Sequence, residues 1–510
     1  MSTEPMRLRF GTAGLRGPVG DGPDAMNVPN VVTATAGLAA WLGAHGRAGG
    51  TVVVGRDARH GSAEFATAAA EVLAAAGFDV VLLPEPGPTP LVAFATRRLA
   101  AVAGVMITAS HNPPADNGYK VYLDGGAQLI SPADSEIEEQ IGLAGDPARV
   151  ARRAVTSDRR AQAVLPDYLA RLRVRFGRPA AAPLRIALTP MHGVGGATAL
   201  AALTQAGVTD VRVVDAQFTP DPDFPTVAFP NPEEPGATDL LLELARNCEA
   251  DLAIALDPDA DRCAVGVPVG GRWRMLTGDE TGALLGDAVL DEYEPFGAPA
   301  PVVASSIVSG TLLDTLARAR GADARRTLTG FKHLVRAGEP LVYAYEEALG
   351  HCVDPEAVRD KDGISAAVAL SLLAAERKRA GTDLAARLDE LAAVYGPHRT
   401  AQRSRRLAGQ HDLDAVMARL RSAPPAELGG ILVQVRDFAD GTAAGVGRLR
   451  TDAVELSGSS ADGVALRIVV RPSGTEPKIK FCGQVSAAPG TAPEGLNGLL
   501  ARALKALSDE

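Results

Sequence analysis

Short apolar runs of strand length alternate with longer alanine- and leucine-rich runs of helix length over most of this 510-residue chain. Residues 51–55, 63–76 and 79–83 have the pattern of a strand–helix–strand unit, residues 185–215 repeat it, and residues 301–320 begin a third unit. This alternation predicts an α/β protein in which helices cover parallel or mixed sheets. A chain of this length is expected to form three or four domains with ample core.

The last section of the chain has a different pattern. One helical run, at residues 412–420, is followed by three strand-like runs without long helices between them, at residues 431–435, 443–449 and 466–470. Consecutive strands of this kind predict a separate, smaller α+β domain at the C-terminal end.

One loop that follows a predicted strand carries a serine, a histidine and a proline in close succession. Residues 108–113 (TASHNP) come directly after the apolar run 102–107, and Lys120 follows soon after. Pro113 fixes its own backbone angle and restricts the residue before it, so the hydroxyl of Ser110 is expected on a stiff loop. Taken alone, a serine followed by Asn-Pro is also typical of an ordinary turn.

Three aspartates alternate along a loop between two further predicted strands. Asp257, Asp259 and Asp261 repel one another by roughly 4 kcal/mol per close pair at an effective dielectric near 20. The cluster therefore requires solvation, partial protonation or a bound cation, and hard oxygen ligands favour Mg²⁺ or Ca²⁺. Arg262 and Pro268 stand where an EF-hand loop needs glycine and glutamate, which excludes that motif. The sequence predicts a Mg²⁺ site, with a solvated acidic hairpin as the alternative.

A third loop has the composition of a phosphate-binding site. Arg471, Ser473, Gly474 and Thr475 follow the strand-like run that ends near residue 471. The glycine frees the backbone, the hydroxyls and main-chain N–H groups can donate, and the arginine offers a bidentate guanidinium. The spacing of a nucleoside-triphosphate loop is absent, which favours a smaller phosphate ester over ATP. A plain Pro/Gly turn at a strand end is the alternative.

Two weaker segments accompany these loops. Residues 10–17 (FGTAGLRG) form a glycine-rich stretch with one arginine, Arg16. Residues 345–351 (YEEALGH) follow an apolar stretch and contain Glu346 and Glu347, which can accept hydrogen bonds from sugar hydroxyls. A Glu-Glu pair is also common on a solvated surface.

The composition agrees with a cytoplasmic location. A net charge of −10 argues against binding to nucleic acid or to an anionic membrane, and no apolar run reaches 18 residues. The four cysteines lie far apart, as expected for reduced thiols, and the N-terminal residues do not have the pattern of a signal peptide. We therefore expect no nucleic-acid or membrane partner, and a monomer or a small homo-oligomer.

The five segments, in this order, resemble the motifs of the α-D-phosphohexomutase superfamily, which includes phosphoglucomutase and phosphomannomutase. The resemblance extends from residue 10 to about residue 481, and the segments TLTGFK and EEALG are most similar to the branch that contains phosphopentomutase and glucose-1,6-bisphosphate synthase. It implies four domains around a central cleft, three with mixed α/β/α sheets and a smaller C-terminal α+β domain. The expected domains are residues 1–178, which carry the phosphoserine loop, residues 179–298, which bind the metal, residues 299–400, which bind the sugar, and residues 401–510, which bind the phosphate.

The resemblance implies a phosphosugar mutase that moves phosphate between C1 and C6 of a hexose phosphate, either glucose or mannose. Ser110 would carry a phosphoryl group, give it to the sugar monophosphate and receive the other phosphoryl group of the resulting sugar 1,6-bisphosphate, which would also act as the activator. The implied Mg²⁺ ligands are Ser110, Asp257, Asp259 and Asp261. The cation would offset the nearly two negative charges of a phosphoserine.

The remaining roles are implied position by position. Lys120 would act as the general acid/base, and it would need a lowered pKa to act as a base. His111, Arg16 and Arg262 would support the phosphoryl group or the attacking hydroxyl. The implied substrate-binding residues are Thr329, Gly330, Lys332, Glu346, Glu347 and His351. The implied phosphate-binding residues are Arg471, Ser473, Gly474 and Thr475.

Ala348 departs from the pattern of the superfamily, because many relatives have serine two residues after the sugar-binding glutamate. A site built to bind a hydroxyl can discriminate by on the order of 10⁴-fold, so the loss of one donor leaves the sugar open. A phosphopentomutase acting on ribose phosphates is therefore the alternative. A phosphatase with Asp257 as the phosphoryl acceptor would leave the serine and Arg471 loops without roles, and a non-catalytic binder would not need Ser110 and all three aspartates.

Overall fold

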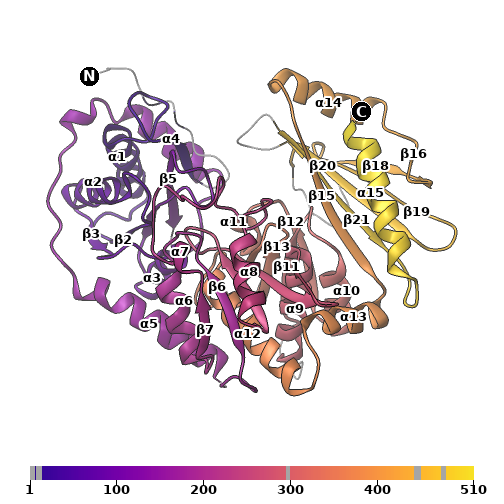
Figure 1. Cartoon of the computed structure of the whole chain (residues 1–510). Helices are drawn as coiled ribbons and strands as arrows, with labels where there is room; N and C mark the ends of the chain where they lie inside the picture. The colour runs from indigo at the N-terminus through magenta and orange to yellow at the C-terminus, as the bar shows by residue number, and fades with distance from the viewer. Residues whose placement is uncertain are drawn as a thin grey trace. The chain divides into compact units, whose positions relative to one another are not determined.

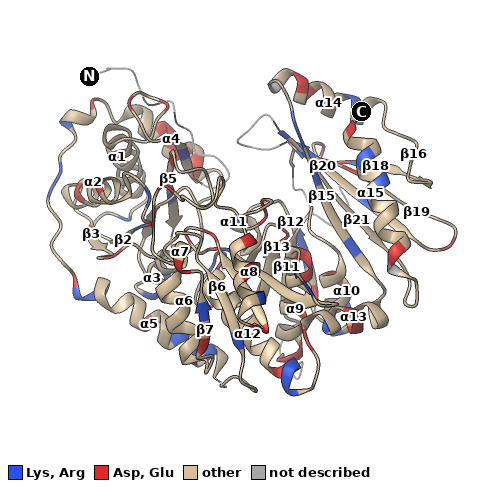
Figure 2. Cartoon of the chain, in the orientation of Figure 1, with Lys and Arg blue, Asp and Glu red and all other residues tan. Residues whose placement is uncertain are grey.

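The structure is a computed structural model (Figure 1), and the chain forms two units, residues 1–276 with 348–382 and residues 277–347 with 383–510. The residues that it describes are 6, 8, 14–123, 125–177, 179–293, 299–441, 450–472 and 478–509. Within these ranges, no helix combines the length and the apolar character that crossing a membrane requires. Lysines and arginines are interspersed with aspartates and glutamates along both units (Figure 2).

The first sheet of the first unit has the strand order β1-β5-β4-β2-β3. Its strands are β1 (Leu15–Pro18), β2 (Thr51–Arg56), β3 (Asp79–Leu82), β4 (Ala103–Ile107) and β5 (Asp116–Leu123). Strands β4, β2 and β3 are parallel, and β5 runs antiparallel to both β4 and β1. Its helices are α1 (Val28–Ala44), α2 (Ser62–Ala75), α3 (Thr89–Arg98), α4 (Ala133–Leu143) and α5 (Arg159–Phe176), with a short 3₁₀ turn at Pro147–Arg149.

The predicted strand–helix–strand unit is confirmed as β2, α2 and β3, with limits that differ by one residue. The three valines of β2, residues 52–54, have no exposed surface. Parallel strands are covered on both faces and therefore consist of continuous apolar runs. This burial explains why the sequence pattern identified the unit.

The second sheet of the first unit has the order β10-β9-β8-β6-β7. Its strands are β6 (Arg185–Thr189), β7 (Asp210–Val213), β8 (Leu252–Leu256), β9 (Cys263–Val269) and β10 (Arg272–Met275). The other elements of this part are α6 (Gly196–Gln205), α7 (Asp215–Phe218), α8 (Asp239–Asn247), β14 (Gly350–Cys352) and α12 (Gly363–Arg379). Strands β8 and β9 are antiparallel neighbours, so the three aspartates lie in the loop of a buried hairpin.

The second unit contains a parallel group of strands in which β11 lies between β12 and β13. These strands are β11 (Val302–Ser306), β12 (Asp323–Thr327) and β13 (Leu341–Glu346), and the helices are α9 (Gly278–Asp291), α10 (Leu312–Ala319), α11 (Phe331–Leu334) and α13 (Leu384–Tyr395). The predicted third unit is confirmed as β11 and α10.

The C-terminal part of the second unit is an antiparallel sheet of order β15-β21-β20-β19-β18 with helices beside it. Its elements are β15 (His398–Arg406), α14 (Gln410–Ser422), β16 (Glu427–Leu428), β17 (Ile431–Leu432), β18 (Gln434–Asp437), β19 (Val454–Ser459), β20 (Ala465–Pro472), β21 (Lys478–Ser486) and α15 (Pro493–Asp509). The smaller α+β domain is therefore confirmed in its class.

Two details of this C-terminal prediction need correction. The strand expected at residues 431–435 is two short strands, β17 and β18, which pair with different partners. Sequence reasoning also missed β15, β19 and β21 as strands. The strand expected at residues 443–449 lies outside the described residues and stays a prediction. The exact limits of the four predicted domains stay a prediction.

Candidate active site

Ser110 is placed by the loop between β4 and β5, and its backbone is in the left-handed region with φ 55°. Only 1% of its surface is exposed. Its N–H donates to Thr108 Oγ1 at 2.9 Å, and its hydroxyl donates to Asp257 Oδ2 at 3.2 Å. A non-glycine residue in this conformation costs on the order of 1–3 kcal/mol, and such strain clusters at functional sites.

Asp257, Asp259 and Asp261 are brought together by the loop between β8 and β9. One carboxylate oxygen from each lies within 4.8 Å of the others, and all three side chains are buried. Burial, and then the charges of Asp259 and Asp261, raise the pKa of Asp257 well above its ordinary value. Three buried carboxylates at this separation require positive charge nearby.

The donor set of this cluster fits a divalent cation. Within the described part of the chain, Asp259 Oδ1 and Asp261 Oδ1 are buried and accept no hydrogen bond. A buried carboxylate oxygen without a partner is costly, and such oxygens are the ligands that Mg²⁺ prefers. Asp257 Oδ1 differs, because it accepts the backbone N–H of Arg262 at 3.0 Å.

Lys120 is buried beside the same aspartates. Its Nζ lies 2.7 Å from Asp259 Oδ2 and 3.0 Å from Asp261 Oδ2. Burial alone would lower the pKa of the Lys120 ammonium, but the two carboxylates outweigh it and raise that pKa. The lowered pKa that a general base would need is therefore not what this structure shows, because opposite charges stabilise the ammonium.

Two neighbours of the aspartates were missed by sequence reasoning. Lys361, which is 7% exposed, lies with its Nζ 3.1 Å from Asp261 Oδ2. Thr89, at the start of α3, donates its hydroxyl to Asp259 Oδ2 at 2.6 Å. Neither residue stands in a sequence pattern that indicates a site. Lys361 belongs to a short charged run, and Thr89 belongs to an ordinary helix start. Only tertiary packing brings them here.

The other residues predicted around the serine are also in this part of the first unit. His111 Nδ1 lies 3.5 Å from Ser110 Oγ, and Arg16 Nη1 donates to Asn112 Oδ1 at 3.1 Å. The Arg262 Nε atom is 3.8 Å from Asp257 Oδ2. Burial, and then the charges of Arg262 and Arg16, lower the pKa of His111 well below its usual value, so the imidazole is neutral. Residues 10–13 of the glycine-rich segment lie outside the described residues.

Of the predicted sugar-binding glutamates, Glu346 ends β13 in the second unit and Glu347 follows it directly. Glu346 Oε1 accepts the backbone N–H of Gly330 at 2.5 Å, which ties it to the segment that holds Thr329 and leads into α11 with Lys332. Glu347 Oε2 accepts the hydroxyls of Ser306 and Ser309 at 3.0 and 2.8 Å. These hydrogen bonds fix the orientation of both carboxylates.

His351 lies in the first unit on β14, and its side chain has no exposed surface. Burial lowers its pKa to about 3, so the ring is neutral. The backbone bridge between Arg262 and Gly350 attaches this strand to the end of the aspartate loop. Its role in substrate binding stays a prediction.

Arg471 is near the end of β20 in the second unit and is partly buried. Its Nε atom is buried and has no hydrogen-bond partner among the described residues. Ser473, Gly474 and Thr475, the other predicted phosphate ligands, lie outside the described residues. The phosphate-binding loop therefore stays a prediction.

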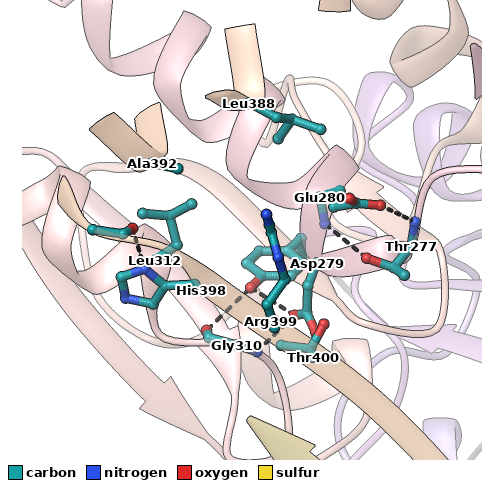
Figure 3. A pocket seen from close by; sticks show the side chains of 12 residues that line it. Thr277, Asp279, Glu280, Gly310, Leu312, Leu388, Ala392, His398, Arg399 and Thr400 are labelled. Carbon is teal, nitrogen blue, oxygen red and sulfur yellow. Dashed lines mark hydrogen bonds between the residues drawn. The ribbon is translucent and has the colours of Figure 1, made fainter. Parts of the chain in front are cut away.

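A pocket in the second unit lies beside the start of α9 and of β15 (Figure 3). Asp279 is held there by the Gly310 N–H at 2.6 Å and the Tyr345 hydroxyl at 3.0 Å, and Thr277 and Glu280 cap α9 with reciprocal hydrogen bonds. The described residues that line the pocket do not include any of the predicted site residues. It is therefore separate from the site expected from the sequence.

Three segments of the chain match models of known protein domains. Residues 7–144, 166–270 and 277–395 match the alpha/beta/alpha domains I, II and III of phosphoglucomutase/phosphomannomutase. Together they cover more than half of the chain. The matched segments include the serine loop, the aspartate loop and the two glutamates.

Full-length relatives give the same result. A probable phosphomannomutase of Haemophilus influenzae is 39% identical over 467 residues, which cover 89% of this chain and 92% of the relative. A probable phosphoribomutase of Schizosaccharomyces pombe is 35% identical over 511 residues, which cover 93% and 86%. The crystal structure of a phosphoglucomutase/phosphomannomutase family protein from Burkholderia thailandensis is similar in fold, with a TM-score of 0.72 at 21% identity and coverage of 98% and 97%.

Proposed function

The chain belongs to the phosphoglucomutase/phosphomannomutase family of the α-D-phosphohexomutase superfamily, and on this basis we propose that it moves phosphate between C1 and C6 of glucose or mannose phosphates. It is an enzyme of the intramolecular phosphotransferase class. We propose that a phosphorylated Ser110 is the working form, that a sugar 1,6-bisphosphate is both intermediate and activator, and that the enzyme acts in the cytoplasm.

The observation that carries this proposal is the contact between Ser110 and the aspartate cluster. Ser110 Oγ lies 3.2 Å from Asp257 Oδ2, and the three aspartates offer buried oxygens within 4.8 Å of one another. A phosphoryl group on Ser110 would therefore stand beside this cluster. Asp257, Asp259, Asp261 and the phosphoserine would hold Mg²⁺, which supplies charge stabilisation to phosphoryl transfer.

Side chains of the first unit are proposed to transfer the proton of the sugar hydroxyl and to stabilise the negative charge of the phosphoryl group. In the forward transfer a sugar hydroxyl forms the new O–P bond and loses its proton, while the bond between phosphorus and Ser110 Oγ breaks. The return transfer reverses these changes. We propose that Lys120 exchanges the proton: its ammonium, which the aspartates keep charged, gives a proton to the Ser110 oxygen that leaves, and the resulting amine takes the proton of the sugar hydroxyl. His111, Arg16 and Arg262 would then stabilise the transferring group by hydrogen bonds and charge.

The residues of the second unit are proposed to hold the sugar. Glu346 and Glu347 would accept hydrogen bonds from sugar hydroxyls, and Thr329, Gly330 and Lys332 would border them. Their carboxylates are already oriented by Gly330, Ser306 and Ser309, which supports recognition by preorganised acceptors. Arg471 with Ser473, Gly474 and Thr475 would bind the phosphate that is not transferred.

A ribose phosphate is the second candidate substrate. The probable phosphoribomutase of Schizosaccharomyces pombe is 35% identical to this chain, and Ala348 removes a hydroxyl beside the sugar-binding glutamates. A missing donor changes the relative affinity for sugars that differ in their hydroxyls. The chemistry at Ser110 would be the same for both substrates.

Phosphorus NMR tests the proposal. Glucose, mannose and ribose 1-phosphates are incubated in parallel with the enzyme, Mg²⁺ and a catalytic amount of glucose 1,6-bisphosphate. We expect a hexose phosphate to be isomerised most rapidly, and Ser110→Ala to abolish the reaction. Isomerisation of ribose phosphate alone would favour the second candidate. Release of inorganic phosphate without isomerisation would contradict a mutase of either kind.

A further inference from the structure

Arg59 lies in the loop between β2 and α2 and is only 4% exposed, although it is charged. Asp57 holds it in place: Asp57 Oδ1 accepts the backbone N–H of Arg59 at 3.0 Å, and Asp57 Oδ2 lies 3.4 Å from Arg59 Nε. The ring of Phe224 lies 4.9 Å from the guanidinium carbon. The guanidinium is therefore fixed both in its plane and from one face.

The two terminal nitrogens of this guanidinium donate to the serine loop. Nη2 donates to the carbonyls of Ser110 and Asn112 at 2.7 and 2.6 Å, and Nη1 donates to those of Pro113 and Asp116 at 2.8 and 3.2 Å. One side chain thus binds four carbonyls between the end of β4 and the start of β5. Hydrogen bonds from a charged donor are roughly twice as strong as neutral ones.

The loop that Arg59 binds is the one that needs support. Ser110 has a φ of 55°, and a residue strained in this way persists only when its surroundings fix it. The carbonyl of Ser110 is itself one of the four acceptors, so the hydrogen bond fixes the strained residue directly. The same residue directs its hydroxyl to Asp257 at 3.2 Å.

We infer that Arg59 is a positioning residue for phosphoryl transfer: its guanidinium holds the backbone of the serine loop so that the Ser110 hydroxyl faces the aspartate cluster. The inference rests on the proposed function, because it assigns a role in the reaction of Ser110. Arg59 donates to the carbonyls of the loop and acts only through the loop. A displacement of about 1 Å at a reacting atom can cost on the order of 100-fold in rate.

The test compares Arg59→Lys with a matched control, Arg171→Lys. Lysine keeps the charge but has one donor atom, so it cannot bind four separated carbonyls. Arg171, a partly exposed arginine of the first unit, also makes a two-pronged contact, because it donates from Nε and Nη2 to Asp354 at 2.6 Å each. The measurements are kcat, KM and melting temperature, together with the rate at which dephosphorylated enzyme takes phosphate from glucose 1,6-bisphosphate.

We expect both variants to melt at lower temperature than the wild type. Only Arg59→Lys is expected to lose kcat, by on the order of 100-fold, with an equally slowed phosphorylation of Ser110 and a KM near that of the wild type. A fall in kcat no larger than that of Arg171→Lys would overturn the inference, because a merely structural arginine gives that result.

A second variant decides the case if Arg59→Lys does not fold. Phe224→Leu keeps every donor of Arg59 but removes the ring that fixes its plane, and we expect kcat to fall below that of Arg171→Lys. A kcat equal to that of Arg171→Lys would then overturn the inference. Wild-type enzyme that isomerises no sugar phosphate would instead overturn the proposed function, so the two failures are distinct.

Discussion

The hydroxyl of Ser110 donates to the carboxylate of Asp257 across 3.2 Å, although the two residues are 147 positions apart in the sequence. Ser110 comes from the loop after β4 of one sheet and Asp257 from the end of β8 of another. A phosphoryl group on Ser110 would carry nearly two negative charges beside buried carboxylates, which is electrostatically unfavourable unless a cation joins them. We therefore expect the proposed reaction of Ser110 to depend on the aspartate cluster.

Loss of one aspartate is expected to weaken metal binding. Asp259→Asn removes a charge whose Oδ1 has no hydrogen-bond partner in the described chain, so a higher Mg²⁺ concentration is needed for half-maximal activity. Titration of the activity with Mg²⁺ after treatment with EDTA measures this. Asp251→Asn, at the other end of β8, is the control and is expected to keep the wild-type dependence. Equal Mg²⁺ requirements in both variants would contradict the assignment.

Replacement of Lys120 is expected to affect the chemical step. Lys120→Met removes the ammonium 2.7 Å from Asp259, and we expect kcat to fall by on the order of 10²- to 10⁴-fold. Lys378→Met removes a more exposed ammonium that pairs with Asp251 and is expected to keep full kcat. Steady-state kinetics of the two purified variants test this. A Lys120→Met enzyme with the kcat of the control would exclude Lys120 from proton transfer.

Stability is expected to depend on Asp362 in mildly acidic solution. Burial raises the pKa of Asp362 to about 6, although it accepts hydrogen bonds from Ser365, Tyr168 and Ile364. The folded state therefore binds this proton more tightly than the unfolded state. Its contribution to the free energy of unfolding is about 3 kcal/mol. This contribution is fully present below about pH 4 and is lost as the pH rises through about 6.

Urea unfolding of the wild type and Asp362→Asn between pH 4 and 7 measures this contribution. The asparagine cannot titrate. As the pH rises, we therefore expect the wild type to lose stability relative to the variant. A difference that does not change with pH would contradict a raised pKa at Asp362.

A serine at position 348 is expected to change the preference between hexose and ribose phosphates. Ala348→Ser adds a hydroxyl next to Glu347, and one additional hydrogen bond corresponds to about a tenfold change in relative kcat/KM. We expect the ratio of hexose to ribose phosphate turnover to rise. Competition between glucose 1-phosphate and ribose 1-phosphate gives the ratio directly. An unchanged ratio would show that position 348 does not determine the sugar.

The fold was predictable where burial creates a periodic pattern. Strands such as β2 and β8 are covered on both faces, so their apolar runs are visible in the sequence. β15 was missed because it is an edge strand with mostly polar and exposed residues, a common composition for sheet edges. Its position depends on pairing with β21, which local sequence does not encode.

The site was predictable only where its residues are clustered in the sequence. The three aspartates and Ser110 stand in recognisable loops, whereas Arg59, Thr89 and Lys361 reach the site singly from other elements. An isolated arginine or lysine in a sequence has no pattern that distinguishes it from a solvated residue. Their contribution depends on packing of the first unit, and the structure was needed to find them.

The most direct test of the central claim is the intact mass of the enzyme after it is mixed with glucose 1,6-bisphosphate and Mg²⁺. We predict that dephosphorylated wild-type enzyme gains the mass of one phosphoryl group, that peptide mapping locates it on Ser110, and that Ser110→Ala gains nothing. A phosphoryl group on Asp257, or a wild-type mass that does not change while the sugar is isomerised, would contradict the account.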